Sequence, residues 1–311
     1  MIADLRRDPV ATRRWLTGAL IFALLVIVSD RLLSIPLRGG LDRYYGLDQD
    51  NELLLVGHSR TVLGIDEELL EKELGVPVSK YAFAGANIND RDAMTRHYIS
   101  TRKTPPKVVV YDVDGSMFST SELSVGSYTF FFPYWDEAVP NAHIREFAPK
   151  DTSLLPLAWF HLTRYDEALL ALSYRGWADM RANLKSSTIN LNALQNRIKN
   201  GKIRPMTIED GAVATFESTL AYCKEHNVRV VLAYIPTVDV LNNVNRAAHD
   251  EVIAKIKSYA DASDTVDFFD YNTANESRHE LFFDGIHLNQ KGSREITALL
   301  AQDLRPLLAD Q

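Results

Sequence analysis

The stretch ELLLVGHSRT, residues 52–61, runs from a short apolar strand through a Gly-x-Ser turn into a pattern that can begin a helix. An uninterrupted apolar strand is typical of a parallel sheet covered on both faces. The turn would place the Ser59 hydroxyl at a sheet edge near a helix N-terminus, where backbone N–H groups face negative charge. Serine is also a common helix cap, so the stretch alone is compatible with two roles for Ser59.

Strands and helices alternate along the rest of the chain, which indicates parallel βαβ units. We therefore predict an α/β fold: a doubly wound, mostly parallel sheet of about five strands flanked by helices, in a flavodoxin-like three-layer sandwich. Ligands of such sheets bind at the carboxyl ends of the strands. Beyond 52–56, the predicted strands are 78–83, 107–113, 229–235 and 266–269, and the predicted helices are 65–74, 90–101, 208–226, 248–260 and 290–308.

Residues 116–205 interrupt this alternation and are predicted to form an insertion between the third and fourth strands of one domain over 51–311. The insertion contains the aromatic run YTFFFPYW at 128–135. Such a run could line a sugar-binding groove or touch lipid headgroups, or it could form the core of the insertion.

The N-terminus combines basic residues with an apolar run, WLTGALIFALLVIV at 15–28, which is typical of export signals. The run is short for a membrane span, but apolar residues continue beyond Asp30 and Arg31 and could extend it. No small-residue cleavage site follows the run, which favours an uncleaved anchor over a removed signal peptide. The basic residues are Arg6, Arg7, Arg13 and Arg14.

We therefore predict a transmembrane signal-anchor at 15–36, preceded by a cytoplasmic segment at 1–14 and followed by a linker at 37–50. The arginines predict a single-pass protein of the inner (cytoplasmic) membrane, whose catalytic domain is periplasmic. The alternative is a buried helix of a soluble protein.

Composition excludes some classes of protein and site. The formal net charge is −7 and no basic stripe is present, so nucleic acid is not an expected partner. The single cysteine, Cys223, is predicted to be a packed thiol, and no zinc-binding spacing exists. We predict no metal and no cofactor. Six histidines without shared ligand spacing are predicted to be surface or helix residues: His97, His143, His161, His226, His249 and His279.

A second motif, FDGIHLN at 283–289, precedes the last predicted helix. Asp284 lies three residues before His287, close enough to accept a hydrogen bond from Nδ1 and leave Nε2 free as a general base. The alternative for Asp284 is a capping residue in a surface turn.

The order Ser59, Asp284, His287 over about residues 51–308 resembles the SGNH/GDSL hydrolase family, which has a Gly-x-Ser block after the first strand and an Asp-x-x-His block near the C-terminus. The resemblance implies that Ser59 is the nucleophile, His287 the base and then the acid, and Asp284 the residue that orients it. It also implies an oxyanion hole built from the N–H groups of Ser59 and Gly85, the latter within AFAGAN at 82–87.

Two positions depart from the family pattern. The usual aspartate before the nucleophile is His58, and the third block has no asparagine, because YDVDGS occupies 111–116. Asn87 or Asn89 could replace that donor. Asp112 and Asp114 are predicted to be turn or cap residues, and Arg60 could hold an anionic group or be solvated at a helix start.

The layout resembles the membrane-anchored, extracytoplasmic branch of the family linked to polysaccharide O-acetylation and teichoic acid D-alanylation. It implies an acyl-ester hydrolase or O-acyltransferase acting on a cell-envelope glycan, with an integral membrane O-acyltransferase as a partner. One alternative is a catalytically weak or inactive accessory protein of such a complex. Another is a metal-dependent hydrolase that uses Asp112, Asp114, Asp284 and His287.

Overall fold

A single five-stranded sheet organises the chain, in a computed structural model that describes residues 9–119, 124–201 and 204–309. All neighbouring strands are parallel, in the order β2-β1-β3-β4-β5. This is the order of a doubly wound, flavodoxin-like sheet, so the predicted fold class is confirmed. The strands are β1 (Leu53–Gly57), β2 (Val78–Ala82), β3 (Val108–Asp112), β4 (Arg229–Tyr234) and β5 (Val266–Asp270).

Each face of the sheet has its own apolar core, because successive side chains of a strand point to opposite faces. In β1, Leu54 and Val56 belong to one core, and Leu53 and Leu55 belong to the other. All four side chains are fully buried. Burial on both faces explains why the strand reads as an uninterrupted apolar run.

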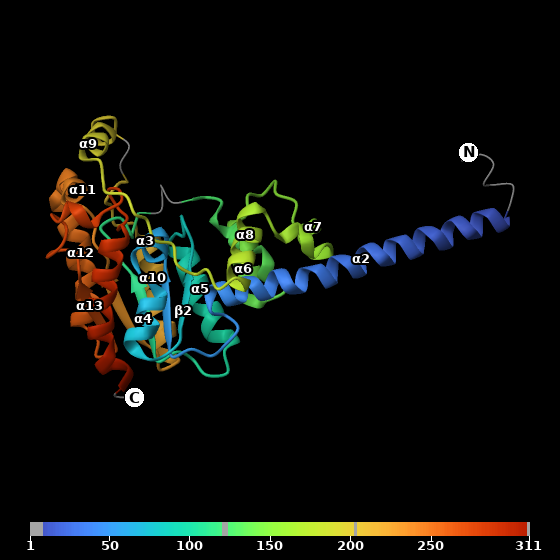
Figure 1. Ribbon diagram of the computed structural model, residues 1–311, viewed down its shortest axis with the longest axis horizontal. Helices are drawn as coiled ribbons and strands as arrows, with labels where there is room; N and C mark the ends of the chain where they lie inside the picture. The colour runs from blue at the N-terminus through green and yellow to red at the C-terminus, as the bar shows by residue number, and fades with distance from the viewer. Residues whose placement is uncertain (1–8, 120–123, 202–203, 310–311) are drawn as a thin grey trace.

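Helices cover both faces. Met94, Phe216 and Ile256 pack in the first core, and they come from α5 (Ile88–Thr101), α10 (Asp210–Glu225) and α12 (Arg246–Asp261). Leu70 and Ile296 pack in the second core, and they come from α4 (Glu67–Leu74) and α13 (Gln290–Ala309). Figure 1 shows these helices around the sheet.

The chain goes from β1 outward to β2 and then returns to β3 on the other side of β1. This reversal opens a crevice at the carboxyl ends of β1 and β3, the usual ligand site of such sheets. The short helix α3 (Ser59–Gly64) starts there, directly after β1.

The long connection from β3 to β4 carries the predicted aromatic run, which forms the 3-10 helix η1 (Ser127–Tyr134). Phe131 and Tyr134 are fully buried, and Phe130 stacks on Phe83 at a centroid distance of 4.3 Å. The run is therefore core, as one of the two interpretations predicted. The other helices of this connection are α6 (Ala138–Phe147), α7 (Leu155–Trp159), η2 (His161–Arg164), α8 (Glu167–Trp177) and α9 (Leu191–Lys199).

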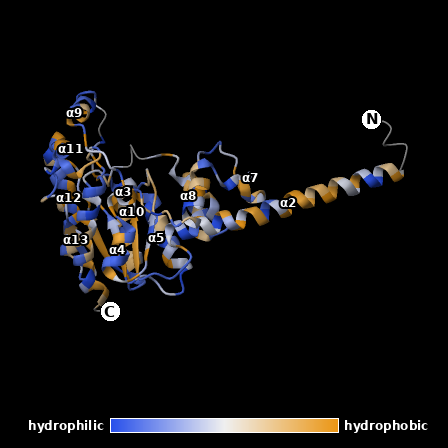
Figure 2. Ribbon diagram, in the orientation of Figure 1, coloured by the Kyte–Doolittle hydropathy of each residue, from blue (hydrophilic) through white to orange (hydrophobic). Residues whose placement is uncertain are grey.

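Helix α2 (Pro9–Tyr45) extends away from the domain, and Figure 2 shows that its projecting part is largely apolar. Leu20 is 72% exposed and Phe22 is 69% exposed. The alternative of a buried helix in a soluble protein is therefore wrong for this part of the chain. An 18-residue window of the helix has a mean hydropathy of 2.1, so by length and composition the helix could cross a membrane, as could a signal sequence.

The linker predicted at 37–50 is wrong for residues 37–45, which continue α2. The glycines that suggested a linker instead allow two helices to approach closely. A Cβ atom on Gly40 would lie 2.3 Å from the backbone oxygen of Ser173 in α8, and one on Gly176 would lie 1.8 Å from that of Gly40. The second half of α2 is thus packed into the domain. Of the predicted cytoplasmic segment, residues 1–8 lie outside the described residues.

Candidate active site

The three side chains predicted to converge do so. Ser59 Oγ lies 2.8 Å from His287 Nε2, and His287 Nδ1 lies 2.9 Å from Asp284 Oδ2. Ser59 is the first residue of α3, whereas Asp284 and His287 come from the loop between η4 (His279–Leu281) and α13. A hydroxyl, an imidazole and a carboxylate therefore form one continuous hydrogen-bonded chain at the sheet edge.

The turn that carries Ser59 is tight because of Gly57. A Cβ atom there would lie 1.8 Å from Thr61 Oγ1 and 2.9 Å from Asp112 Cβ, so only glycine lets β1 end this close to α3 and β3. His58 caps α3, since its Nδ1 accepts a hydrogen bond from the Arg60 backbone N–H at 3.2 Å. The Ser59 hydroxyl is thereby held at the start of the helix, where it is partly exposed.

The opposite loop is built around Asp284. Its Oδ1 accepts from the backbone N–H groups of Ile286 and His287, at 2.9 and 3.0 Å. A carboxylate only accepts, so His287 carries its proton on Nδ1 and leaves Nε2 free to accept from Ser59. Burial acts to raise the pKa of Asp284, but the hydrogen bonds and charge of His287 and the two backbone N–H groups lower it overall.

A second histidine–aspartate pair lies beneath the nucleophile. His58 Nε2 is 3.1 Å from Asp114 Oδ2, and its Nδ1 already accepts from Arg60 N–H. Both ring nitrogens are therefore occupied, and His58 is the tautomer protonated on Nε2. Burial lowers the pKa of His58, so the ring stays neutral near pH 7.

Arg60 ties three strand ends together. Its Nη2 donates to Asp112 Oδ1 at 2.8 Å and to the Val113 carbonyl at 2.5 Å, and its Nη1 donates to Thr237 Oγ1 at 2.7 Å. The side chain is 2% exposed, so the predicted alternative of a solvated arginine is wrong. Arg60 also borders a cavity, but its guanidinium makes most of its hydrogen bonds within the protein.

Asp112 and Asp114 have a larger role than the turn or cap residues predicted from the sequence. Asp114 does accept from the Ser116 N–H at 2.5 Å, as a turn residue would, but both carboxylates also face Arg60. Burial acts to raise the pKa of Asp114, yet Arg60 and His58 hold it well below its usual value. Asp112 and Asp114 thus belong to a buried ionic network that supports the Ser59 turn.

The predicted alternative was a metal site on Asp112, Asp114, Asp284 and His287, but these side chains belong to two separate sets of partners. The first two carboxylates pair with Arg60 and His58, and Asp284 pairs with His287. Among the described residues, no group of three or more His, Cys, Asp or Glu side chains is placed to hold a metal ion together.

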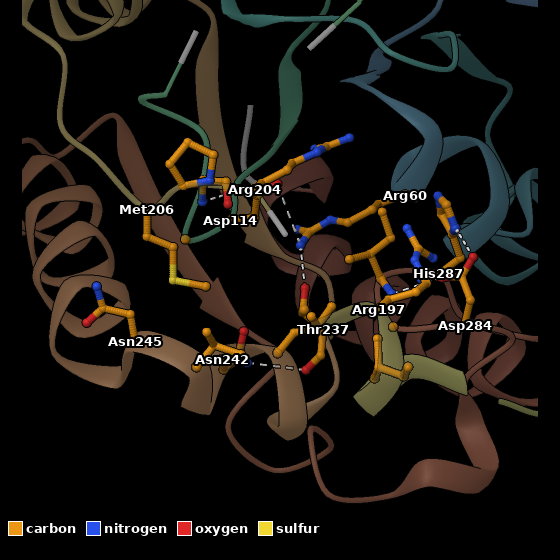
Figure 3. Close-up of a pocket in the computed structure, with 18 residues that line it drawn as sticks. Arg60, Asp114, Arg197, Arg204, Met206, Thr237, Asn242, Asn245, Asp284 and His287 are labelled. Atoms are coloured by element: carbon orange, nitrogen blue, oxygen red, sulfur yellow. Dashed lines mark hydrogen bonds and ion pairs between the residues drawn. The ribbon is translucent and has the colours of Figure 1, made fainter. Parts of the chain in front are cut away.

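A cavity of about 530 Å³ opens beside His287 and Asp284 (Figure 3). Its acidic wall residues already have partners, Asp114 in the buried network and Asp284 on His287. Two wall arginines, Arg197 and Arg204, make no hydrogen bond or ion pair with any residue in the described ranges. The rest of the wall includes Ser116, Leu194, Met206, Thr237, Leu241, Asn242, Asn245 and Ile286.

The predicted oxyanion donors lie at the end of the neighbouring strand β2. Gly85 has a φ of +81°, and a Cβ atom there would lie 2.9 Å from Ser124 Cβ, so the position requires glycine. Asn87 caps α5, because its Oδ1 accepts from the N–H groups of Asn89 and Asp90. No described contact joins Gly85 or Asn87 to Ser59, and their role as donors stays a prediction.

Several residues predicted to lie outside the site do so. Cys223 is buried, which raises the pKa of its thiol to about 12, as expected for a packed cysteine. Three of the histidines predicted to be surface or helix residues are helix residues. His97, His143 and His249 are buried within α5, α6 and α12 and bonded to other side chains.

Sequence reasoning missed three residues that border the cavity. Thr237 follows β4 by only a few residues, so its place at a strand end could have identified it. Arg197 lies in α9 and Arg204 lies in the irregular stretch after it, and no motif marks either residue. Only the folded arrangement brings them to the cavity.

Comparison with known proteins gives distant structural matches. No family model and no curated protein sequence matches the chain. A provisionally assigned acylhydrolase from Bacteroides fragilis is 11% identical, with a TM-score of 0.45 over 87% of this chain and 98% of that one. A GDSL-like lipase from Bacteroides thetaiotaomicron is 12% identical, with a TM-score of 0.40 over 82% and 87% of the two chains.

An acetylxylan esterase from Geobacillus stearothermophilus, in a catalytic mutant form, is 13% identical, with a TM-score of 0.41 over 85% of this chain and 96% of that one. Likenesses this distant do not assign a function to the chain.

Proposed function

We propose that the chain is a serine-dependent acyl-ester hydrolase or O-acyltransferase in which Ser59 carries the acyl group. One observation supports this above all others: the unbroken hydrogen-bonded chain from Ser59 through His287 to Asp284. A serine hydroxyl is a weak nucleophile until an adjacent base removes its proton. The free Nε2 of His287, in the tautomer set by Asp284, is such a base.

In the first half-reaction, Ser59 Oγ attacks the ester carbonyl carbon while its proton passes to His287 Nε2. Asp284 stabilises the resulting imidazolium, as in serine hydrolases of other folds. The bond from the carbonyl carbon to the alcohol oxygen then breaks. His287 returns the proton to that oxygen, so the alcohol leaves neutral and the acyl group stays on Ser59.

The second half-reaction decides between hydrolysis and transfer. His287 takes a proton from water or from a glycan hydroxyl, whose oxygen attacks the acyl carbon on Ser59. The bond to Ser59 Oγ breaks, and the proton on His287 returns to that oxygen. Water gives a free acid, whereas a glycan hydroxyl gives a new ester.

The oxyanion formed in each step needs donors. We propose the backbone N–H groups of Ser59 and Gly85, with Asn87 Nδ2 in place of the asparagine absent from the third block. Asn87 uses its side-chain oxygen as the helix cap, which leaves the amide nitrogen for this purpose. A missing donor would raise the barrier of the reaction by about 3 kcal/mol, so the rate depends strongly on whether Asn87 supplies this hydrogen bond.

The proposed substrate is an ester on a cell-envelope glycan. Arg197 and Arg204 favour an acidic glycan, because cations in a cavity wall attract a carboxylate or phosphate beside the ester. We further propose that α2 anchors the chain in the inner membrane with the domain in the periplasm, as Arg13 and Arg14 before the apolar run favour. An integral membrane O-acyltransferase is a fitting acyl donor for such a protein.

The test is the Ser59→Ala variant of the full chain. A fluorophosphonate probe should label the wild type, and both labelling and acetate release from p-nitrophenyl acetate should be lost in the variant. Ser258→Ala is the matched control, since Ser258 is an exposed serine on α12 far along the chain from the site. Equal labelling and turnover in Ser59→Ala and wild type would instead support the non-catalytic accessory role.

A further inference from the structure

The uninterrupted apolar run of α2, before its first charged residue, is too short to cross a bilayer without the residues that follow it. The run at 15–28 is about 21 Å long as a helix, whereas a hydrocarbon core is about 30 Å thick. Continuing to residue 35 brings the length to about 31 Å. That extension contains two charged residues, Asp30 and Arg31, which would be costly near lipid unless they had partners.

Both charges have partners in one neighbouring segment. Asp30 is 5% exposed, and its carboxylate accepts the backbone N–H groups of His161 and Leu162 at 2.7 and 2.9 Å. Arg31 Nη2 lies 3.3 Å from the Trp159 carbonyl oxygen. The segment formed by α7 and the start of η2, residues 155–162, therefore satisfies the polar groups of α2 at this level.

Apolar side chains meanwhile point outward from both elements at the same level. On α2 the exposed fractions are 61% for Leu32, 56% for Leu33 and 66% for Ile35. On the partner segment they are 69% for Leu155 and 68% for Trp159. Exposed apolar side chains are therefore present on both α2 and α7. Figure 1 shows α7 beside α2, at the point where α2 leaves the domain.

We propose that residues 155–162 lie in the interfacial layer of the bilayer that α2 crosses, as a second point of contact with lipid. Tryptophan is enriched at this depth because its ring is apolar and its N–H is polar. Contacts of both α2 and residues 155–162 with lipid would fix the orientation of the domain relative to the membrane. A single helix would leave the domain free to rotate and tilt. The inference rests on the membrane anchoring proposed above and is independent of the esterase chemistry.

This second contact would also fix the position of the active site relative to the membrane. Helices α9 and α11 (Asp239–Asn242) contribute cavity residues, and Figure 1 shows them at the end of the domain opposite to α7. With α7 at the lipid surface, the cavity lies at the end of the domain away from the membrane. This orientation suits a glycan chain extending into the periplasm rather than a lipid ester.

The experiment measures tryptophan quenching by brominated lipid. The full chain, with Trp15→Phe to remove the tryptophan of the span, is placed in phosphatidylcholine nanodiscs with or without brominated acyl chains. Adding Trp159→Phe should abolish most of the lipid-dependent quenching. Trp177→Phe is the matched control, because Trp177 contacts α2 at Pro36, about 8 Å further along the helix axis than Arg31, and should leave the quenching unchanged.

Quenching that persists undiminished in Trp159→Phe would overturn the proposal, because the ring would then face water or protein. A chain that fails to remain with the nanodiscs would overturn both the anchor and this second contact. Esterase activity on p-nitrophenyl acetate is measured on the same samples and should be equal in all variants. If Trp159→Phe does not reduce the quenching but the samples retain esterase activity, the lipid contact is wrong and the proposed chemistry still stands.

Discussion

His58 and His287 each bond to an aspartate, and both lie next to Ser59, one in sequence and one in space. The side chain of His287 is 16% exposed and that of His58 is 2% exposed. His58 uses both ring nitrogens within the fold, whereas His287 uses only Nδ1 on its aspartate and offers Nε2 to Ser59.

The comparison teaches that a histidine–aspartate pair does not by itself make a base. A general base needs a nitrogen that is unprotonated, reachable and close to the proton it removes. His287 meets these conditions. His58 shares its neighbourhood but has no free nitrogen, so we assign it to positioning the turn. The two aspartates should therefore respond oppositely to the same substitution.

The largest expected effect is on catalysis by Asp284→Asn. The amide would favour the wrong tautomer of His287, so kcat on p-nitrophenyl acetate should fall about 10³- to 10⁴-fold. Stability should change by no more than about 1 kcal/mol, because the carboxylate is partly exposed. Steady-state kinetics and chemical denaturation of the same preparation test this. A variant that keeps its rate but unfolds readily would reverse the roles assigned to the two pairs.

Asp114→Asn should have the opposite profile. Removing this carboxylate leaves the buried charge of Arg60 less compensated and weakens the hydrogen bond of His58, so the free energy of unfolding should fall by about 3 kcal/mol at pH 7. The rate should fall far less than in Asp284→Asn. Denaturant midpoints of the two variants, measured side by side, give the comparison directly.

The pH dependence of the same variant sharpens the comparison. The folded state lowers the pKa of Asp114, so its contribution to stability is complete above the unfolded pKa of about 4 and is lost as pH falls through the folded pKa. The stability difference between wild type and Asp114→Asn should therefore be constant from pH 7 to about 5 and shrink below about pH 4. A difference that grows in acid would contradict the ionic role of this carboxylate.

The smallest expected effect concerns the cavity arginines. Arg197→Gln and Arg204→Gln should each raise KM for an acetylated acidic glycan by about 5-fold, the size of one charge-assisted hydrogen bond lost near solvent. Neither should change kcat/KM for p-nitrophenyl acetate, which has no anion to bind. Assays with acetylated polygalacturonate and acetylated xylan supply the acidic and neutral substrates. Equal changes on both glycans would remove the preference for acidic substrates.

Much of the fold could be predicted from local patterns. The predicted strands at 107–113 and 229–235 contain β3 and β4, because buried parallel strands are apolar at every position and leave a pattern that does not depend on distant residues. The linker predicted at 37–50 was wrong for residues 37–45, because the local pattern does not show how these residues pack. Glycines usually break helices, and only the packing of Gly40 against α8 shows why they are tolerated here.

The sequence by itself determined the alternation of strands and helices, the apolar anchor-like run and the residue types of the candidate site. These depend on periodicity and spacing along the chain, which are local properties. The tertiary structure alone decided which histidine has a free nitrogen, where Arg60 directs its charge and what satisfies Asp30. Those outcomes depend on hydrogen bonds between residues far apart in sequence, such as Arg60 with Thr237 and Asp30 with His161, and no local pattern encodes such pairings.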